Sequence, residues 1–306
     1  MYIIGENLHI VSPRFKEAIA NRDTAYVQGL AKKQVEAGAS ALDLNVGPQK
    51  KSGPEVMTWL VNAVQEVVDV PLSFDTTNLD AIVAGLQLAR RQAIINSTSA
   101  QPERLERVPP VAAQYQSRLI ALTMGESGIP VSAEARVSIA LEQLLPRCEE
   151  VGLPLANVLI DPLVLTVSGC QEYVPQCIEA VRILKQASDP APLVSAGLSN
   201  VSNQVPKEHR PLLNRTYAVM LMAVGLDAMI ADPLDRQLGE FIRVVERRDE
   251  STALNHLLLT LHDRTRDGEE LVADDVNWQD PDQVAIYKTV QVLLNKVIYA
   301  DGYLAV

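Results

Sequence analysis

Polar side chains, mostly acids and amides, recur in this chain at the ends of short apolar runs. Side chains of these types can bind a ligand or take part in catalysis. They are Glu6, Asn7, Asp43, Asn45, Asp75, Asn78, Asn96, Ser97, Asp161, Asn200 and Asp232. A polar bend, GLSNVSN, brings Ser199, Asn200 and Asn203 onto one turn. A single aspartate in such a place is often only a helix N-cap. The whole set is harder to explain as caps, because unpaired polar groups in a confined space are costly.

The chemistry of these side chains indicates what they would bind. Carboxylates accept hydrogen bonds, amides both donate and accept them, and little positive charge accompanies them at these ends. Such a set suits a neutral heterocycle that presents N–H donors. A metal ion held by oxygen ligands is the alternative. The four histidines show no HExxH pattern or other ligand spacing, so we expect no protein-bound zinc.

Short apolar runs alternate with longer amphipathic stretches from the first residue, which is typical of parallel strands joined by helices. Eight strands are predicted, at 2–6, 41–46, 71–77, 93–98, 118–124, 157–162, 192–200 and 226–232. Eight strand and helix pairs within about 240 residues predict a (β/α)8 TIM barrel, in which the carboxyl ends of the strands share one catalytic mouth. A doubly wound sheet is the alternative, but no GxGxxG follows the first strand.

Capping residues set the predicted helix limits. Asp23 should cap a helix that stops at Gly38. A second helix should begin after Ser132, and Pro146 should kink or interrupt it, because proline lacks the N–H that the helix needs.

The pattern changes after Pro233. We interpret residues 1–306 as a single domain with a charged helical insertion at about 245–283, which contains an apolar helix from Leu254 to Leu261. A long apolar helix is predicted to follow from Val284 to Tyr299. The charge run of the insertion indicates a solvated face better than a site.

Composition excludes several classes of function. Basic residues number 27 against 38 acidic ones, a net charge of −11, which argues against nucleic acid or an anionic membrane as the main partner. The start of the chain resembles neither a signal peptide nor a membrane anchor. Cys148, Cys170 and Cys177 form no CxxC motif, which fits reduced thiols. We therefore expect a cytoplasmic enzyme or binding protein.

Six motifs carry a resemblance to a known family. ALDLNVGP, FDTTN, IINST, IDPL, GLSNVS and RPLLNRT, in this order, resemble the pterin-binding methyltransferases that move a methyl group between methyltetrahydrofolate and a corrinoid protein. These proteins have a dihydropteroate synthase-like barrel. They include the acetogen methyltransferase acting on the corrinoid iron–sulfur protein, O-demethylase components, and the folate domain of cobalamin-dependent methionine synthase. The resemblance covers residues 1 to about 232 and resumes at the last predicted helix.

The resemblance implies roles for particular residues. Asp75, Asn96 and Asp161 match residues that hydrogen-bond the pterin ring, and Asn200 matches the asparagine that contacts N5, which bears the methyl group. Glu6, Asp43, Ser199 and Asn203 complete the implied pterin site. The first strand continues as GENLH where the family often has GERIN, which leaves the roles of Asn7 and His9 open.

The resemblance also implies substrates and partners. Methyltetrahydrofolate or tetrahydrofolate would be the substrate, the corrinoid (cobalamin) would be carried by a partner protein, and the chain would form a homodimer without a metal of its own. The transfer would serve O-demethylation or the acetyl-CoA (Wood–Ljungdahl) pathway, and the sequence leaves its direction open.

Two other functions remain open. A dihydropteroate synthase-like enzyme shares the fold and the pterin pocket, but it would need basic residues near the last strand for a pyrophosphate leaving group, and only Arg236 follows that strand closely. A non-catalytic folate-binding subunit of a corrinoid complex is the other possibility, and the presence of Asn200 argues against it.

Overall fold

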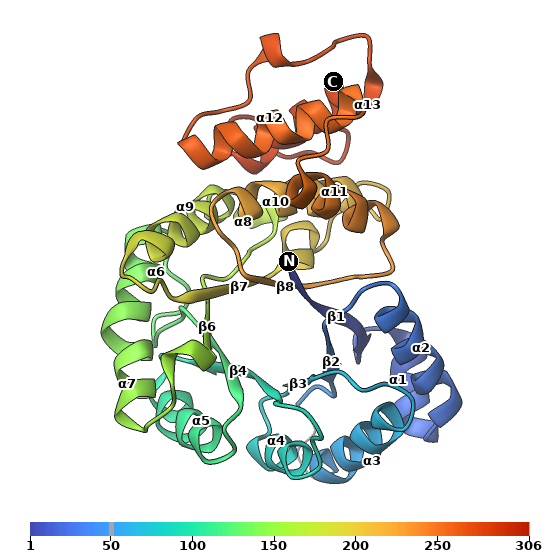
Figure 1. Ribbon diagram of the computed structural model, residues 1–306, viewed down its shortest axis with the longest axis vertical. Helices are drawn as coiled ribbons and strands as arrows, with labels where there is room; N and C mark the ends of the chain where they lie inside the picture. Colours follow the sequence, from blue (N-terminus) through green and yellow to red (C-terminus); the bar gives the residue numbers. More distant parts are fainter. Residues whose placement is uncertain (49–51, 306) are drawn as a thin grey trace.

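The computed structural model describes residues 1–48 and 52–305, and its centre is a closed barrel of eight parallel strands (Figure 1). The strands are β1 (Tyr2–His9), β2 (Ala41–Asn45), β3 (Leu72–Asp75), β4 (Ile94–Ser99), β5 (Arg118–Leu122), β6 (Val158–Asp161), β7 (Leu193–Gly197) and β8 (Ala228–Ala231). Each strand pairs with the next, and β1 closes the barrel on β8. The predicted (β/α)8 barrel is confirmed.

Strand register brings polar residues to one level at the carboxyl end of the barrel. Asn45 pairs with Asp75, Asp75 pairs with Asn96, and Leu122 pairs with Asp161. Because neighbouring parallel strands end together, side chains far apart in sequence become neighbours. The register of the strands is therefore enough to bring these side chains together, without any contribution from the loops.

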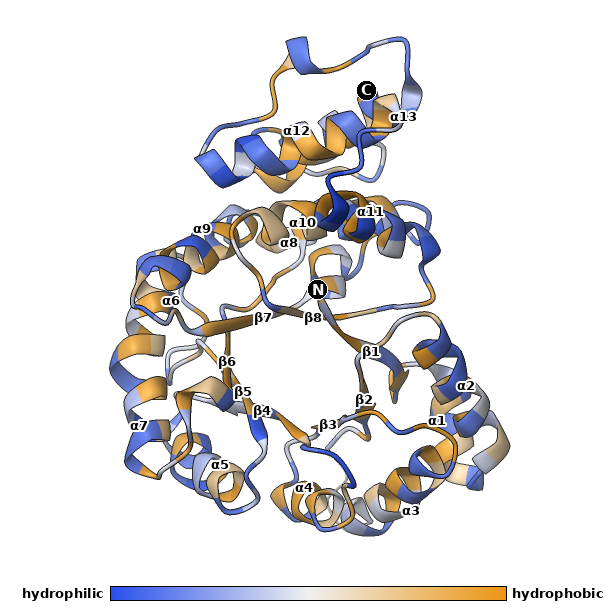
Figure 2. Cartoon of the chain, viewed as in Figure 1, coloured by the Kyte–Doolittle hydropathy of each residue, from blue (hydrophilic) through white to orange (hydrophobic). Residues whose placement is uncertain are grey.

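Below that level the barrel interior is mostly apolar, with the buried Ser73 and Ser195 as exceptions. Its filling is a cluster of buried side chains, Ile4, Ala41, Ile94, Ile120, Leu159 and Ala228. A larger core lies between the strands and the surrounding helices, where apolar helix faces pack on the outside of the barrel. Figure 2 shows hydrophobic and hydrophilic residues alternating along these helices, as expected for elements with one buried face.

The helices that surround the barrel follow the strands in order. They are α1 (Pro13–Asn21), α2 (Thr24–Glu36), α3 (Gly53–Gln65), α4 (Leu79–Leu86), α5 (Pro102–Gln114), α6 (Ala133–Ile139), α7 (Leu145–Glu150), α8 (Val167–Cys170), α9 (Tyr173–Gln186), α10 (Arg210–Ala223) and α11 (Arg236–Arg247). Asp23 caps α2 as predicted, accepting a hydrogen bond from the Tyr26 N–H at 3.1 Å. Gly38, at φ 103°, follows that helix in a conformation that favours glycine.

Pro146 interrupts its helix in the predicted place. Ser132 caps α6, and a wider π-helical turn (Ala140–Leu144) joins α6 to α7, whose second residue is Pro146. The wider turn accommodates the missing N–H hydrogen bond and the proline ring.

The segment after the barrel contains α12 (Ala253–Asp267) and α13 (Pro281–Leu293), which pack against the outer side of α10 (Figure 1). The insertion predicted from residue 245 begins later, because α11 continues to Arg247. The prediction of a helix as far as Tyr299 was wrong, since α13 ends at Leu293. The chain turns there because the Gln171 amide bonds the Val292 and Val297 carbonyls, each at 2.7 Å, and accepts from the Tyr299 N–H.

No helix in the described part of the chain is long and apolar enough to cross a bilayer.

Candidate active site

The carboxyl end of the barrel opens into a cavity of about 1100 Å³. The eight residues of the implied pterin site line it: Glu6, Asp43, Asp75, Asn96, Asp161, Ser199, Asn200 and Asn203. Of the other strand-end candidates, Asn7 and Asn78 are not among the lining residues, and Asn78 instead caps α4. The eight come from β1, β2, β3, β4, β6 and the turn after β7. The structure thus places them in one site, and their roles toward a ligand stay predictions.

Asp43 and Asp75 form an acidic pair on the cavity floor. Asp43 Oδ1 accepts hydrogen bonds from Ser73 Oγ at 2.6 Å and from Asn96 Nδ2 at 3.1 Å, and Asp75 accepts one from Asn45 Nδ2. Burial raises the pKa of both carboxyls, and the nearby Asp75 charge raises the pKa of Asp43 further. Two carboxylates in one buried place cannot both ionise at low cost, so loss of the second proton is disfavoured.

Asp161 lies at the end of β6 with only 4% of its surface exposed. Its carboxylate accepts hydrogen bonds from the Leu163 N–H, at 2.8 Å, and from the Gly197 N–H. Burial raises the pKa of Asp161 to about 7, although these bonds and the charge of Arg136 lower it. Both protonation states are therefore accessible near neutral pH, and Asp161 can accept a hydrogen bond or donate one to a flat heterocycle.

Glu6 extends from β1 toward the turn after β7, where Ser199 Oγ donates a hydrogen bond to its Oε1. Desolvation raises the pKa of Glu6 to about 7, and the charge of Asp232 raises it further against the effect of Ser199. Asp232 accepts hydrogen bonds from Asn7 Nδ2 and the Leu234 N–H, both at 2.9 Å.

Asn200 lies on a short 3₁₀ helix (Leu198–Ser202) that follows β7 directly. Leu198 and Val201 are buried and fix this turn, while Asn200 is exposed in the cavity. A Cβ atom on Gly197 would lie 2.9 Å from Asn200 Nδ2, so glycine permits this close approach. Asn200 Oδ1 accepts a hydrogen bond from Asn203 Nδ2 at 3.2 Å, which orients the amide.

The outer wall of the cavity carries cations, and of these the sequence had indicated only Arg236. Lys207, Arg210, Arg215 and Arg236 line it, together with Asn214. Little positive charge was expected near the ligand, which holds for the strand ends but not for this wall. Most of these cations were not predicted as site residues, because they lie on α10 or just before it and not at the end of a strand. The motif RPLLNRT was the available signal, because positions four apart on a helix share a face.

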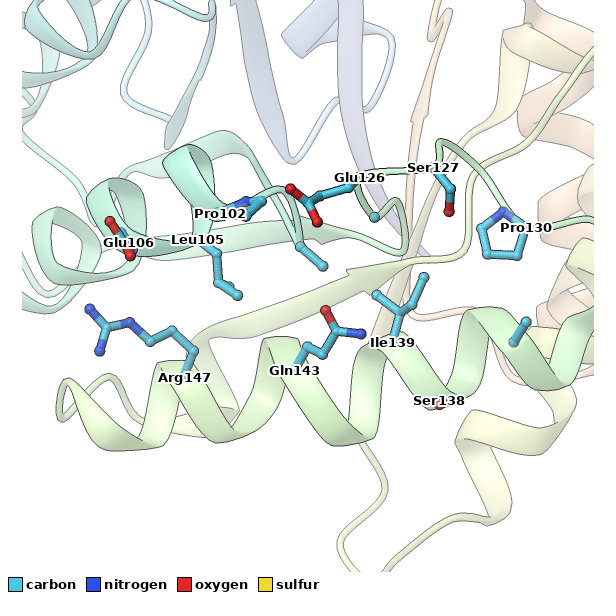
Figure 3. Close-up of a pocket in the computed structure, with 13 residues that line it drawn as sticks. Pro102, Leu105, Glu106, Glu126, Ser127, Pro130, Ser138, Ile139, Gln143 and Arg147 are labelled. Atoms are coloured by element: carbon cyan, nitrogen blue, oxygen red, sulfur yellow. The ribbon is translucent and has the colours of Figure 1, made fainter.

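A second hollow, of about 1140 Å³, lies outside the barrel between α5 and the α6–α7 helix (Figure 3). Glu106, Glu126, Gln143 and Arg147 are among its polar residues. None of the predicted site residues reaches it, so the barrel mouth is the candidate active site despite its slightly smaller volume.

No group of three or more His, Cys, Asp or Glu side chains in residues 1–48 and 52–305 is arranged to hold a metal ion.

The fold and the mouth define a barrel protein with a polar pocket, and comparison with known proteins gives its family. The profile of the family described as pterin binding enzyme matches residues 12–232, so the chain belongs to that family and the resemblance seen in its motifs is confirmed. It is 28% identical over 240 residues to a methylcorrinoid:tetrahydrofolate methyltransferase of Eubacterium limosum, covering 78% of this chain and 87% of that protein.

Other relatives agree with this family. Methionine synthase of Mycobacterium leprae is 29% identical over 238 residues, which cover 74% of this chain but 20% of that much longer protein. Among solved structures, dihydropteroate synthase of Yersinia pestis is similar with a TM-score of 0.59 and 18% identity, covering 81% of this chain and 92% of that one. At that identity the likeness shows the shared barrel fold only.

Proposed function

We propose that this protein transfers the N5 methyl group between methyltetrahydrofolate and the cobalt of a corrinoid protein. The observation that carries the proposal is the convergence of Asp75, Asn96, Asp161 and Asn200 on one open cavity. The similarity to a methylcorrinoid:tetrahydrofolate methyltransferase, along most of both chains, supports this reaction over others.

The floor of the cavity would bind the pterin ring. A reduced pterin presents an amino group and a ring N–H along one edge, and carboxylate oxygens are suitable acceptors for both. Asp75 and Asp161 supply such oxygens, while Asn96 offers an amide that already bonds Asp43. The raised pKa values of these buried acids mean that ligand N–H groups would supply stabilisation that the empty site lacks.

Asn200 would act at N5. The methyl group leaves N5 without its bonding electrons, so the electron pair stays on nitrogen, and hydrogen bonding or protonation of that nitrogen lowers the barrier. The Asn200 amide can donate to a lone pair or accept from an N5–H. It cannot supply a proton at neutral pH, so the proton would reach N5 through water or a carboxyl group of the mouth.

The partner would be a corrinoid-carrying protein that docks on the open mouth, because the cobalt must reach the methyl group. We further propose a homodimer working in the cytoplasm, in agreement with the family resemblance and with the three free thiols. O-demethylation and the acetyl-CoA pathway are the two settings proposed for the reaction.

A dihydropteroate synthase-like activity is the second candidate, because Lys207, Arg210 and Arg215 supply the basic residues near the cavity that the sequence alone did not place there.

An assay of methyl transfer tests the proposal. Purified protein with methyltetrahydrofolate and cob(I)alamin should produce methylcobalamin, followed by the change in corrinoid absorbance. Folate binding without transfer to cob(I)alamin or to a corrinoid protein would favour a binding subunit. Condensation of p-aminobenzoate with a pterin pyrophosphate, in place of methyl transfer, would favour the second candidate.

Asp161→Ala tests the pterin pocket. The substitution removes an acceptor for the ligand, and we expect tetrahydrofolate affinity to fall about 10- to 100-fold, the size of a lost hydrogen bond to a charged group. Titration calorimetry measures it, with Asp267→Ala on the surface of α12 as the control. Unchanged affinity in Asp161→Ala would contradict the pocket assignment.

A further inference from the structure

The cavity has two chemically different sides. Its floor, at the strand ends, is acidic, and its outer wall on and around α10 carries Lys207, Arg210, Arg215 and Arg236. A volume of about 1100 Å³ lies slightly above the range for small-molecule sites, roughly 300–1,000 Å³. The site is therefore roomy for a bicyclic ring alone, and the wall has space to contact another part of the ligand.

Three of these cations, Lys207, Arg210 and Arg236, are free to bind an anion in the described part of the chain, and Lys207 and Arg210 lie on the same α10 side of the wall as Asn214. Arg215 is occupied, because its Nε and Nη2 bond Asp235 at 2.8 and 2.7 Å and its Nη1 bonds Gln237. Arg210 uses only Nε, which donates to the Val205 carbonyl at 2.6 Å and holds the side chain in place. Among the residues that the structure describes, neither Lys207 Nζ nor the terminal nitrogens of Arg210 have a hydrogen-bond or ion-pair partner.

The acids nearby do not neutralise them. Asp235 is held by Arg215, and Asp232 accepts hydrogen bonds from Asn7 and from the Leu234 N–H. Glu208 follows Lys207 in the sequence but does not line the cavity.

Asn214 adds a third group on the same wall. Its side-chain oxygen is shielded from solvent and has no hydrogen-bond partner in the described part of the chain. A buried acceptor without a donor costs free energy, and a ligand N–H would relieve that cost. On the protein side, the unpaired Asn214 oxygen lies on the same wall as the free cations Lys207 and Arg210. A ligand that carries an amide N–H next to carboxylates would complement these groups.

We propose that Lys207, Arg210 and Asn214 bind the glutamyl tail of the folate, with the cations on its carboxylates and Asn214 on its amide N–H. The inference rests on the proposed function and adds the form of the substrate: a folate with glutamyl residues, better still with several. The acidic floor would then orient the head group and the cationic wall the tail, so the two ends of the ligand cannot exchange places.

Calorimetry with a tail-less pterin and with folates that carry different numbers of glutamates tests this inference. The probes are 6-methyltetrahydropterin, which has no tail, and methyltetrahydrofolate with one or three glutamates. Wild-type protein should bind the triglutamate about tenfold more tightly than the tail-less pterin, a modest gain because both cations remain partly solvated. The gain should shrink in 0.5 M salt, because salt screens such pairs.

The variants are Lys207→Gln, Arg210→Gln and the double variant, with Lys32→Gln on α2 as a control for the loss of one surface charge. The double variant should lose the preference for glutamylated folate and keep its affinity for the tail-less pterin. Arg210→Lys keeps the charge and should retain part of the preference, and circular dichroism checks that each variant folds.

Three results would overturn the inference. Wild-type protein could bind both ligands equally, or the double variant could keep the full preference. The variants could also impair methyl transfer to a corrinoid protein but not to free cobalamin, with tail preference unchanged, which would assign the cations to an acidic face of the partner. A protein that binds neither ligand would instead contradict the proposed function.

Discussion

Carboxylates at the barrel mouth and carboxylates in the segment after α11 have opposite environments. In the mouth, Glu6 and Asp161 have pKa values raised to about 7, chiefly because the protein desolvates them. In the later segment, Arg248 holds the pKa of Asp263 well below its usual range, and the Ser251 hydroxyl and N–H lower the pKa of Asp249. The same residue types therefore titrate on opposite sides of their ordinary values.

This difference in pKa distinguishes the candidate active site in the barrel mouth from the solvated surface of the later segment. Acids of the later segment are satisfied by the protein itself, as expected of a charged solvated face. Acids of the mouth cost stability in the empty protein, because burial desolvates their charged forms more than the surrounding hydrogen bonds and charges compensate. Groups kept at such a cost often belong to functional sites. Four substitutions test this contrast.

Asn200→Ala should have the largest effect. Removing the amide beside N5 should lower turnover 10²- to 10³-fold, by analogy with the loss of one donor that stabilises developing charge. Single-turnover methyl transfer to cob(I)alamin measures it. Asn203→Ala, which removes only a neighbour of that amide, should lower turnover less. Wild-type turnover in Asn200→Ala would remove this residue from the mechanism.

Gly197→Ala tests whether the position of the Asn200 amide matters, since the amide itself stays in place in the sequence. The added Cβ would meet Asn200 Nδ2 at 2.9 Å and displace the amide, and a misplacement of about 1 Å can cost up to 10²-fold in rate. We expect a 10- to 100-fold loss of turnover with a nearly unchanged melting temperature. Gly239→Ala, on α11 with open space around its Cβ, is the matched control. Equal turnover in the two variants would show that the close approach is unimportant.

Glu6→Gln should stabilise the empty protein, and only at higher pH. The folded-state pKa of Glu6 is raised, so its contribution favours folding below about pH 4.5 and is lost as pH rises through 7. Glutamine removes that loss, and we expect a gain of about 2 kcal/mol in the free energy of unfolding at pH 8. Urea denaturation at pH 4.5 and pH 8 measures it, and an equal gain at both pH values would exclude a charge effect.

Asp263→Asn should have the smallest effect. Asp263 pairs with Arg248 on a partly exposed surface, so its loss should cost at most about 1 kcal/mol of unfolding free energy at pH 7. Because the folded pKa is lowered, the contribution is present above the unfolded pKa and is lost as pH falls. The cost should also shrink in 0.5 M salt. A loss as large at high salt would mean that the side chain packs instead of pairing.

The fold was predictable because its signals are local. Apolar runs such as 118–124 and caps such as Asp23 and Ser132 act through neighbouring residues, and the structure has strands or helices where they indicate them. The end of α13 was not predictable in this way. Its apolar pattern continues past Leu293, but a buried glutamine from before α9 binds the chain there and turns it.

The sequence by itself determined the eight strands, their order, and the acids and amides at their ends, because alternating hydrophobicity and strand-end polarity depend on residues close together along the chain. Only the tertiary structure decided that burial and the Asp75 charge raise the pKa of Asp43, how near Gly197 lets Asn200 approach, and that α10 presents cations to the same cavity. Burial and contact between distant segments set those properties, and both arise only when the barrel closes.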